Sequence, residues 1–532
     1  MRTRLQILFL IVFSLTLHAQ KIAKVNSTTS VDWRKSQKIN INNISTWIHW
    51  DGRSDINYNN AGFEFPKGSK KYCFYQSGII WGGKVNDEIR VGGSTYFSSL
   101  SQGWIQPNGQ PIDINDQRVR IYKVRKNFET DDLTEEATDE ERTVDEIYKQ
   151  YKKGAEEWPV DLGAPFDDVN GDEIYTFGID NPGITGAHQT IWYVANDIKF
   201  NSKPTFIELQ NTVWAYNSAY PLDRTIFKKY VLINQGNEII HDMYIGMFSD
   251  PDIGTANEFA GCDTVFNLGY SYKSNLLDTV YGTKPPAVGF LLLQGPMVNG
   301  RELQMTSFHY NKLPFPDVDP DLDMLRNIWV YNALQGLIEY TGEKFIDPIT
   351  GEETKFPLSG DPVNKIGWID SQLGITDKRF YLSSGPFDFE PGDTQVVIFA
   401  QIAAQGTDRL ESVRQLKRLA FQLIYSFPSL MGTYPTELPR EVPEYFYLSQ
   451  NYPNPFNPST EIKYEIPIDC SVTLRVYDLL GREVATLVDE YKQAGIYNST
   501  FNINNLTLSS GVYIYSLQAG PYYKYKKMMF IK

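Results

Sequence analysis

Short runs rich in β-branched and aromatic residues recur along the chain, and in one of them, residues 472–477, apolar and polar positions alternate. Such runs are typical of strands. Two of them, at residues 79–85 and 88–93, are separated only by Asn86 and Asp87. Because Asn and Asp tolerate the positive φ of tight turns, we expect these runs to form a β-hairpin. A further run at residues 396–402 predicts another strand, and the chain is expected to be mainly β.

Two segments instead repeat their apolar residues at the spacing of a helix. In the first, Thr143 and Glu146 can form a capping box, and the helix is expected to stop at Gly154. Asp408 and Glu411 can cap the second segment, which carries a longer apolar face. It follows the strand at residues 396–402 in the sequence. We therefore expect this helix to pack against the sheet to which that strand belongs.

The last 87 residues, 446–532, contain several short strands separated by turns that contain glycine. Residues 472–477 show the clearest alternation of apolar and polar positions. Three prolines within residues 433–445 disfavour a helix or a central strand and predict an extended linker. The expected fold is multi-domain: a β-rich body with a few helices, followed by a small C-terminal β-sandwich.

Four sequence blocks in this C-terminal region resemble a known family. They are NYPNPFNPST at residues 451–460, VYDLLGREV at 476–484, LSSGVY at 508–513 and KKMMFIK at 526–532. In this order they resemble the C-terminal (type A) sorting domain of type IX secretion cargo. The resemblance implies an immunoglobulin-like sandwich related to a domain of the flagellar hook-capping protein. It also implies that the translocon and sorting machinery of a Gram-negative outer membrane read the domain, which is commonly removed on release or on attachment to surface polysaccharide.

The N-terminus carries the signals of export. Arg2 and Arg4 precede an apolar stretch at residues 5–17, and cleavage is expected after Ala19, so residues 1–19 are predicted to be a signal peptide. Thirteen apolar residues are too short to span a bilayer as a helix, and no later segment is long and apolar enough. The mature protein is therefore predicted to lack a membrane span and to be secreted or held at the cell surface.

Charge is unevenly distributed in this chain. Its net charge of -14 argues against nucleic acid as a partner, because phosphate binding requires basic stripes. Residues 129–173 alone contain 17 Asp and Glu but four Lys and Arg, a local charge of -13. We therefore divide the body into an N-terminal β-rich region at 20–128, an acidic helical segment at 129–157 and a central β-rich domain with a C-terminal helix at 158–432.

The three cysteines, Cys73, Cys262 and Cys470, allow at most one disulfide and show no spacing typical of a zinc site. We expect them to be buried as small apolar residues. The chain also lacks the HExxH, GxSxG and Walker-type motifs. A glycosidase needs only two carboxylates, however, so a hydrolase stays open as an alternative.

Calcium is the cofactor for which the sequence offers the best candidates, because alternating carboxylates and amides can wrap around a hard cation. The first candidate loop begins as EF-hand and dockerin loops do but has Glu173 in place of the expected glycine. A second candidate is a run of four alternating aspartates, and a third is an aspartate pair that Glu258 or Asp263 could join. The candidate ligands are Asp168, Asn170, Asp172 and Asp180 in the first; Asp317, Asp319, Asp321 and Asp323 in the second; and Asp250 and Asp252 in the third.

All ten tryptophans precede the C-terminal region. Aromatic side chains on a β-sandwich can stack on sugar rings, although tryptophans are also ordinary core residues of large β domains. Glycan or surface polysaccharide is therefore a candidate partner. The sequence favours a secreted or surface protein whose body has a structural or binding role, with calcium as a stabilising ion. The alternative is a secreted hydrolase that acts on polysaccharide or peptide.

Overall fold

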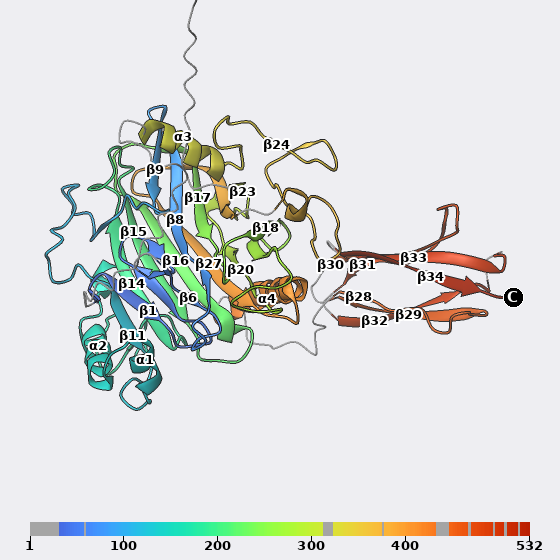
Figure 1. The fold of residues 1–532 in the computed structure, drawn as a ribbon, viewed down its shortest axis with the longest axis horizontal. Helices are drawn as coiled ribbons and strands as arrows, with labels where there is room; N and C mark the ends of the chain where they lie inside the picture. The colour runs from blue at the N-terminus through green and yellow to red at the C-terminus, as the bar shows by residue number, and fades with distance from the viewer. Residues whose placement is uncertain are drawn as a thin grey trace, which may run out of the picture.

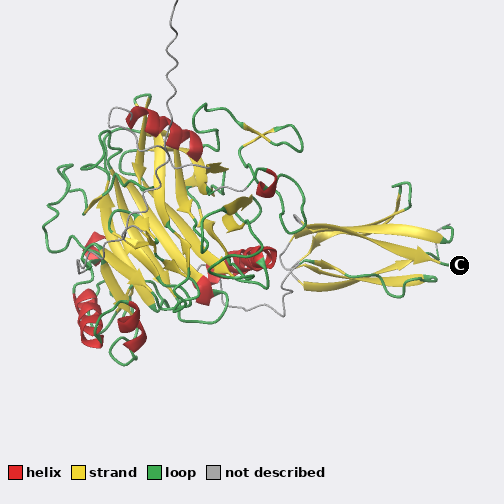
Figure 2. Cartoon of the chain, in the orientation of Figure 1, coloured by secondary structure: helices red, strands yellow, loops and turns green. Residues whose placement is uncertain are grey.

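The computed structural model describes residues 31–57, 60–311, 323–374, 377–431, 446–466, 470–492, 495–504, 508–519 and 522–532. The predicted signal peptide at 1–19 and the predicted linker at 433–445 lie outside these residues. The described chain is mostly β, as predicted, with two large antiparallel sheets in the body and two smaller sheets in the C-terminal region (Figure 1). Figure 2 shows the helices on the outside of the body, and two of them pack on strands of the two sheets.

The first body sheet has eight strands, all paired antiparallel. In spatial order they are β1 (Ser36–Ile39), β2 (Thr46–His49), β3 (Arg53–Ser54), β8 (Gln76–Val85), β17 (Ile240–Asp250), β26 (Arg379–Phe389) and β23 (Ser307–Asn311), with β9 (Glu88–Gly93) paired to β8. The predicted hairpin is confirmed as β8 and β9. Asn86 and Asp87 at its turn both have positive φ, 51° and 61°.

The second body sheet has nine strands, again antiparallel. In spatial order they are β10 (Ser101–Gln102), β14 (Gln189–Asn196), β15 (Ile207–Ala215), β16 (Thr225–Asn234), β27 (Thr394–Ala404), β20 (Ala287–Gln294), β19 (Leu268–Lys273) and β18 (Glu258–Asp263), with β11 (Tyr122–Arg125) paired to β14. Trp81 and Phe380 of the first sheet share one buried cluster with Tyr230 and Phe399 of the second. The body is therefore a sandwich, and strands from residues 20–128 and from residues 158–432 contribute to both of its sheets.

Shorter elements complete the body. The short strands are β4 (Ile56–Asn57), β5 (Asn60–Ala61), β6 (Phe63–Glu64), β7 (Tyr72–Phe74), β12 (Phe166–Asp167), β13 (Asn181–Pro182), β21 (Met297–Val298), β22 (Arg301–Glu302), β24 (Phe345–Ile346) and β25 (Glu353–Thr354). The helices are α1 (Thr134–Asp139), α2 (Val144–Glu156), α3 (Asp323–Leu334) and α4 (Arg409–Leu430), with 3-10 turns at Val160–Leu162, Leu222–Arg224 and Asp370–Gln372. No helix in the described ranges is long and apolar enough to cross a bilayer.

Both predicted helices are confirmed, although α2 continues past the predicted stop at Gly154 to Glu156. The side chain of Thr143 accepts a hydrogen bond from the Glu146 backbone N–H, and the Glu146 carboxylate accepts one from the Thr143 backbone N–H, which completes the capping box of α2. Asp408 caps α4, and Leu416 and Leu423 of that helix are buried against the second sheet. Each cap satisfies amide groups that the first turn of a helix leaves without partners.

The acidic segment packs against the body, while most of its acidic side chains are exposed. Helices α1 and α2 cover β11, and two of their acidic residues are buried there. Glu136 lies 2.9 Å from Arg125 Nη1. Glu140 lies 2.6 Å from Lys123 Nζ. Part of the local charge of -13 is therefore compensated by cations from the neighbouring strand.

The C-terminal region is the predicted small sandwich. One sheet orders β28 (Tyr447–Leu448), β29 (Ser459–Ile466) and β32 (Gly495–Asn502), and the other orders β31 (Glu483–Lys492), β30 (Cys470–Tyr477), β33 (Gly511–Ala519) and β34 (Tyr522–Phe530). Alternate residues of these strands, among them Ile462, Leu474 and Leu517, form one buried core. The three cysteines of the chain are all free and buried, as expected, and burial raises the pKa of the Cys73 thiol to about 12.

Candidate functional site

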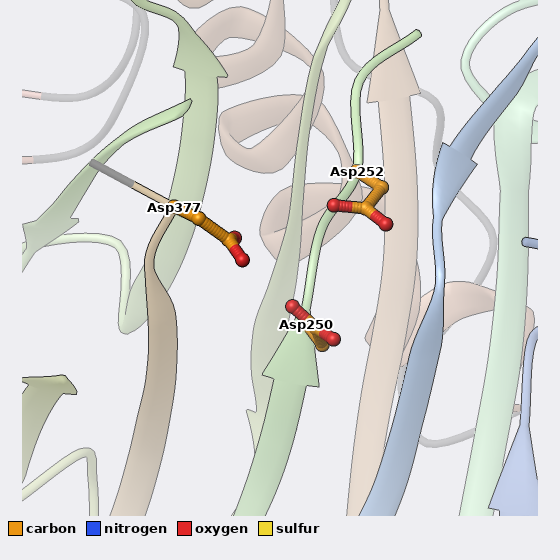
Figure 3. A group of neighbouring side chains, drawn as sticks. All are labelled: Asp250, Asp252 and Asp377. Carbon is orange, nitrogen blue, oxygen red and sulfur yellow. The ribbon is translucent and has the colours of Figure 1, made fainter. Parts of the chain in front are cut away.

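Three carboxylates converge where two neighbouring inner strands of the first body sheet, β17 and β26, end and begin. Asp250 ends β17, Asp252 follows it by two residues, and Asp377 lies just before β26. Because β17 and β26 are antiparallel neighbours, the end of one meets the beginning of the other. One oxygen from each of the three carboxylates lies within 4.8 Å of the other two. Figure 3 shows the three side chains directed toward a common space.

One cation already lies at this cluster. Arg379 Nε is 3.3 Å from Asp250 Oδ1, and Arg379 Nη2 is 2.8 Å from Asp377 Oδ2. The Tyr96 hydroxyl donates a hydrogen bond of 2.6 Å to Asp250 Oδ2 and accepts one from Arg379 Nε. With all three carboxylates ionised, one guanidinium leaves the group with a charge of about two negative units.

The electrostatics of the site are those of an undercompensated cluster. Asp250 is 2% exposed, and burial raises its pKa to about 7, with a further contribution from the neighbouring Asp252. Burial and the proximity of Asp377 raise the pKa of Asp252 to about 6. The Oδ1 atoms of Asp250 and Asp377 are buried and accept no hydrogen bond. Hard oxygen donors with an excess of negative charge fit a divalent cation such as Ca²⁺.

The third sequence candidate is therefore brought together, but with a different partner from those predicted. Glu258 lies 3.3 Å from Lys273 Nζ, and Asp263 lies 2.8 Å from Lys417 Nζ, so each is held by a lysine instead of joining Asp250 and Asp252. Asp377 completes the group. It is distant in sequence, and only the pairing of β17 with β26 brings it near. No local motif could have indicated it.

The structure gives the first sequence candidate a different set of partners. Asp168 accepts hydrogen bonds from the backbone N–H groups of Gly171 and Glu173, both at 2.7 Å, and these bonds lower its pKa. Asn170 donates to Asp172 at 2.9 Å. The carboxylate of Asp180 accepts bonds from the N–H groups of Val169 and Thr176. These acidic side chains hold the backbone of the loop, and calcium binding by them stays a prediction.

The second sequence candidate lies almost wholly outside the described residues. This applies to Asp317, Asp319 and Asp321, whereas Asp323 begins α3. The side chain of Asp323 lies outside the described part as well. Calcium binding by this run of aspartates also stays a prediction.

In the C-terminal sandwich, the first and the last of the four sequence blocks contact each other. Asn451 donates to the Pro453 carbonyl and to Thr460 Oγ1, which fixes the first block internally. Its backbone N–H donates to the Tyr515 hydroxyl, which follows the third block. Phe456 packs on Phe530 of the last block, with ring centroids 5.4 Å apart. Together these contacts tie the beginning and the end of the domain into one unit.

The second block forms an exposed hairpin turn between β30 and β31. The carboxylate of Asp478 accepts hydrogen bonds from the backbone N–H groups of Leu480 and Arg482. Gly481 adopts positive φ of 77°. The side chains of Leu479 and Leu480 are exposed at this turn. The turn therefore presents two apolar side chains to the solvent.

Comparisons with known proteins support the resemblance of the C-terminal region to a sorting domain. A family model described as "Secretion system C-terminal sorting domain" matches residues 450–532. A search of curated proteins finds no match. One solved structure, described as a polysaccharide lyase, aligns with 64% of this chain and 35% of its own chain at 9% identity and a TM-score of 0.22. The chain thus spans about a third of that protein, and a score this low carries no argument about the body. Residues 450–532 are therefore a C-terminal sorting domain, which supports the identification of the chain as cargo of the type IX secretion system.

Proposed function

We propose that the body is a structural or binding module outside the cell, stabilised by a divalent cation held by Asp250, Asp252 and Asp377. The supporting observation is the convergence of three carboxylates with one guanidinium and two buried oxygens that accept no hydrogen bond. Calcium is the ion of choice, because extracellular modules use it at millimolar concentration and tolerate affinities of about 10⁻⁴ to 10⁻³ M. The proposed ion stabilises the fold and takes part in no reaction.

The export of the chain supports an extracellular location for the body. The sorting domain directs export by type IX secretion to the cell surface or the extracellular space. We infer that the signal peptide at 1–19 first directs the chain across the inner membrane of a Gram-negative bacterium, and that the translocon and its sorting machinery then bind the C-terminal sandwich. Surface polysaccharide is the proposed attachment partner after sorting.

Calcium should raise the thermal stability of the folded body. At a concentration of ten to a hundred times the dissociation constant, binding to the folded state alone stabilises by about 1.4–2.7 kcal/mol. Differential scanning calorimetry of the purified protein in calcium and in chelator measures this effect. An unchanged midpoint would count against a structural ion, and magnesium at equal ionic strength controls for salt.

A second proposal concerns glycan binding and rests on a groove of about 600 Å³ beside α2. Its cationic lining residues outnumber its acidic ones, Asp32 and Glu146. The exposed or partly exposed cationic side chains are Arg34, Arg120, Arg142, Lys149 and Lys153. The guanidinium of Arg142 lies over Trp33, with 4.4 Å between the charge centre and the ring centroid. Guanidinium groups cover the aromatic faces, so the groove favours an anionic saccharide over a neutral one.

The substitutions Lys149→Gln and Lys153→Gln together should weaken binding to a polyuronate, because they remove two positive charges from the groove. Lys152→Gln is the matched control, since this exposed lysine lies on the same helix but does not line the groove. Binding to immobilised polyuronate and to neutral dextran, followed at increasing salt, tests the proposal. Equal retention of the double variant and the control would reject it.

The hydrolase alternative has weaker support. Asp250 and Asp252 have pKa values near neutrality, as a general acid would need. Asp250 is buried beneath Tyr96 and Arg379, however, which leaves a polymer no access to it. Asp250, Asp252 and Asp377 do not line the groove beside α2. They do not line two other surface pockets of the described chain either. Of the tryptophans, Trp81, Trp192 and Trp214 are core residues rather than sugar platforms.

A further inference from the structure

Three buried side chains of complementary chemistry meet between the two body sheets. Asn40 directly follows β1 of the first sheet, Lys123 lies in β11 of the second, and Glu140 ends α1. Their exposed fractions are 1%, 2% and 6%. Lys123 Nζ lies 2.6 Å from Glu140 Oε1 and 3.4 Å from Asn40 Oδ1. The same Glu140 oxygen lies 3.5 Å from Asn40 Nδ2. One carboxylate oxygen therefore contacts both the amine and the amide nitrogen.

The neighbouring groups hold this arrangement in place. Gln189 Nε2 donates a hydrogen bond of 3.1 Å to Asn40 Oδ1, which draws electron density from the amide carbon. Arg142 Nη1 lies 3.2 Å from the other oxygen of Glu140 and fixes that carboxylate. The Tyr151 ring lies over Lys123 Nζ, with its centroid 5.4 Å away. The amine is thus enclosed by protein groups, where a positioned nucleophile gains most from proximity.

We propose that Lys123 and Asn40 become joined by an isopeptide bond, with Glu140 as the carrier of protons. Glu140 takes a proton from the Lys123 ammonium, and the neutral Nζ attacks Asn40 Cγ. The hydrogen bond from Gln189 stabilises the negative charge that develops on Oδ1. Glu140 gives its proton to Nδ2 as the Cγ–Nδ2 bond breaks, and takes a second proton from Nζ. Ammonia leaves with that proton as ammonium.

The reaction balances without any other reactant. The Nζ–Cγ bond forms and the Cγ–Nδ2 bond breaks, so one lysine ammonium and one carboxamide become one secondary amide and one ammonium ion. No atom is oxidised or reduced. The charge lost from Lys123 leaves with the ammonium, and Glu140 returns to its ionised form. The three side chains that take part are all on this chain.

Such a bond would link the first strand of one sheet to the edge of the other. It closes the chain between residues 40 and 123 into a covalent loop, which lowers the entropy of the unfolded state as a disulfide does. The described chain has free, buried cysteines and no disulfide. An amide cross-link would serve an exported protein in the same way and would resist reductants.

Peptide mapping of the purified full chain tests the bond directly. Trypsin should release residues 39–53, which contain Asn40, joined to residues 121–125, in which Lys123 escapes cleavage. The linked species should weigh about 17 Da less than the sum of its two peptides, the mass of the ammonia lost. Complete recovery of the separate peptides 39–53 and 121–123 from folded wild-type protein would overturn the proposal.

Variants distinguish the reaction from a simple ion pair. Glu140→Gln should abolish the linked species, since it removes the proton carrier. Lys38→Arg is the matched control: Lys38 lies in the same buried network, 3.0 Å from Asp139, but it is not one of the reacting groups, so the linked species should persist. A folded Glu140→Gln protein that still carries the bond would overturn the role of Glu140. The wild-type peptide map decides the question even where a variant does not fold.

Discussion

A chain that lacks residues 445–532 is expected to lose export entirely while its body still folds. The sorting domain forms its own sandwich around its own buried core, so its removal takes away the signal without opening the body sheets. Protease shaving of intact cells and immunoblotting of the periplasm measure the outcome. The truncated protein should accumulate in the periplasm and be absent from the surface and the medium.

The converse experiment supplies the control. Residues 433–532, placed behind a signal peptide and an unrelated reporter, should bring that reporter to the surface. The melting midpoint of the truncated protein should match that of the full chain's body. Normal surface delivery of the truncated chain would show that the sorting domain is dispensable and would contradict export by type IX secretion.

The substitution Lys273→Met is expected to be the most destabilising single change in the body. Lys273 Nζ lies 3.3 Å from Glu258 Oε1 and 3.4 Å from Asp278 Oδ2, and none of these three side chains is exposed. The same nitrogen donates to the carbonyl oxygens of Ile253 and Ala256. Removing one partner leaves buried charge without compensation, which costs about 3–5 kcal/mol. Urea unfolding followed by tryptophan fluorescence measures the loss.

Lys284→Met is the matched control, because this lysine is exposed and forms no ion pair with any of the described residues. Its substitution should change the free energy of unfolding by less than about 0.5 kcal/mol. Lys273 also holds the loop that follows Asp252, so Lys273→Met should weaken calcium binding as well. A Lys273→Met protein as stable as the control would show that the buried cluster tolerates an uncompensated charge.

Features encoded by neighbouring residues were predictable from the sequence. The turn at Asn86 and Asp87 needs only residues that accept positive φ, and the capping box of Thr143 and Glu146 needs only their spacing. The C-terminal sandwich was predictable for a further reason: its blocks lie close together in the sequence and in a fixed order. Both kinds of signal are local, so they can be identified without knowledge of the tertiary fold.

Features that depend on strand pairing were not predictable. Asp377 joins Asp250 only because β26 lies beside β17, and Lys123 meets Asn40 only because β11 and β1 approach from different sheets. The division of the body at the acidic segment was likewise drawn without knowledge of strand pairing. A change in charge marks that segment in the sequence, but the strands on either side of it form shared sheets.

Calcium titration by isothermal calorimetry tests the central proposal for the body most directly. The wild-type protein should bind one calcium ion at Asp250, Asp252 and Asp377, with an affinity of about 10⁻⁴ to 10⁻³ M. Asp252→Asn should abolish this heat, because it removes one charged ligand. Asp168→Asn, in the loop whose carboxylates hold backbone amides, should leave it unchanged. Absence of binding in the wild type, or loss of binding in Asp168→Asn with retention in Asp252→Asn, would contradict the account.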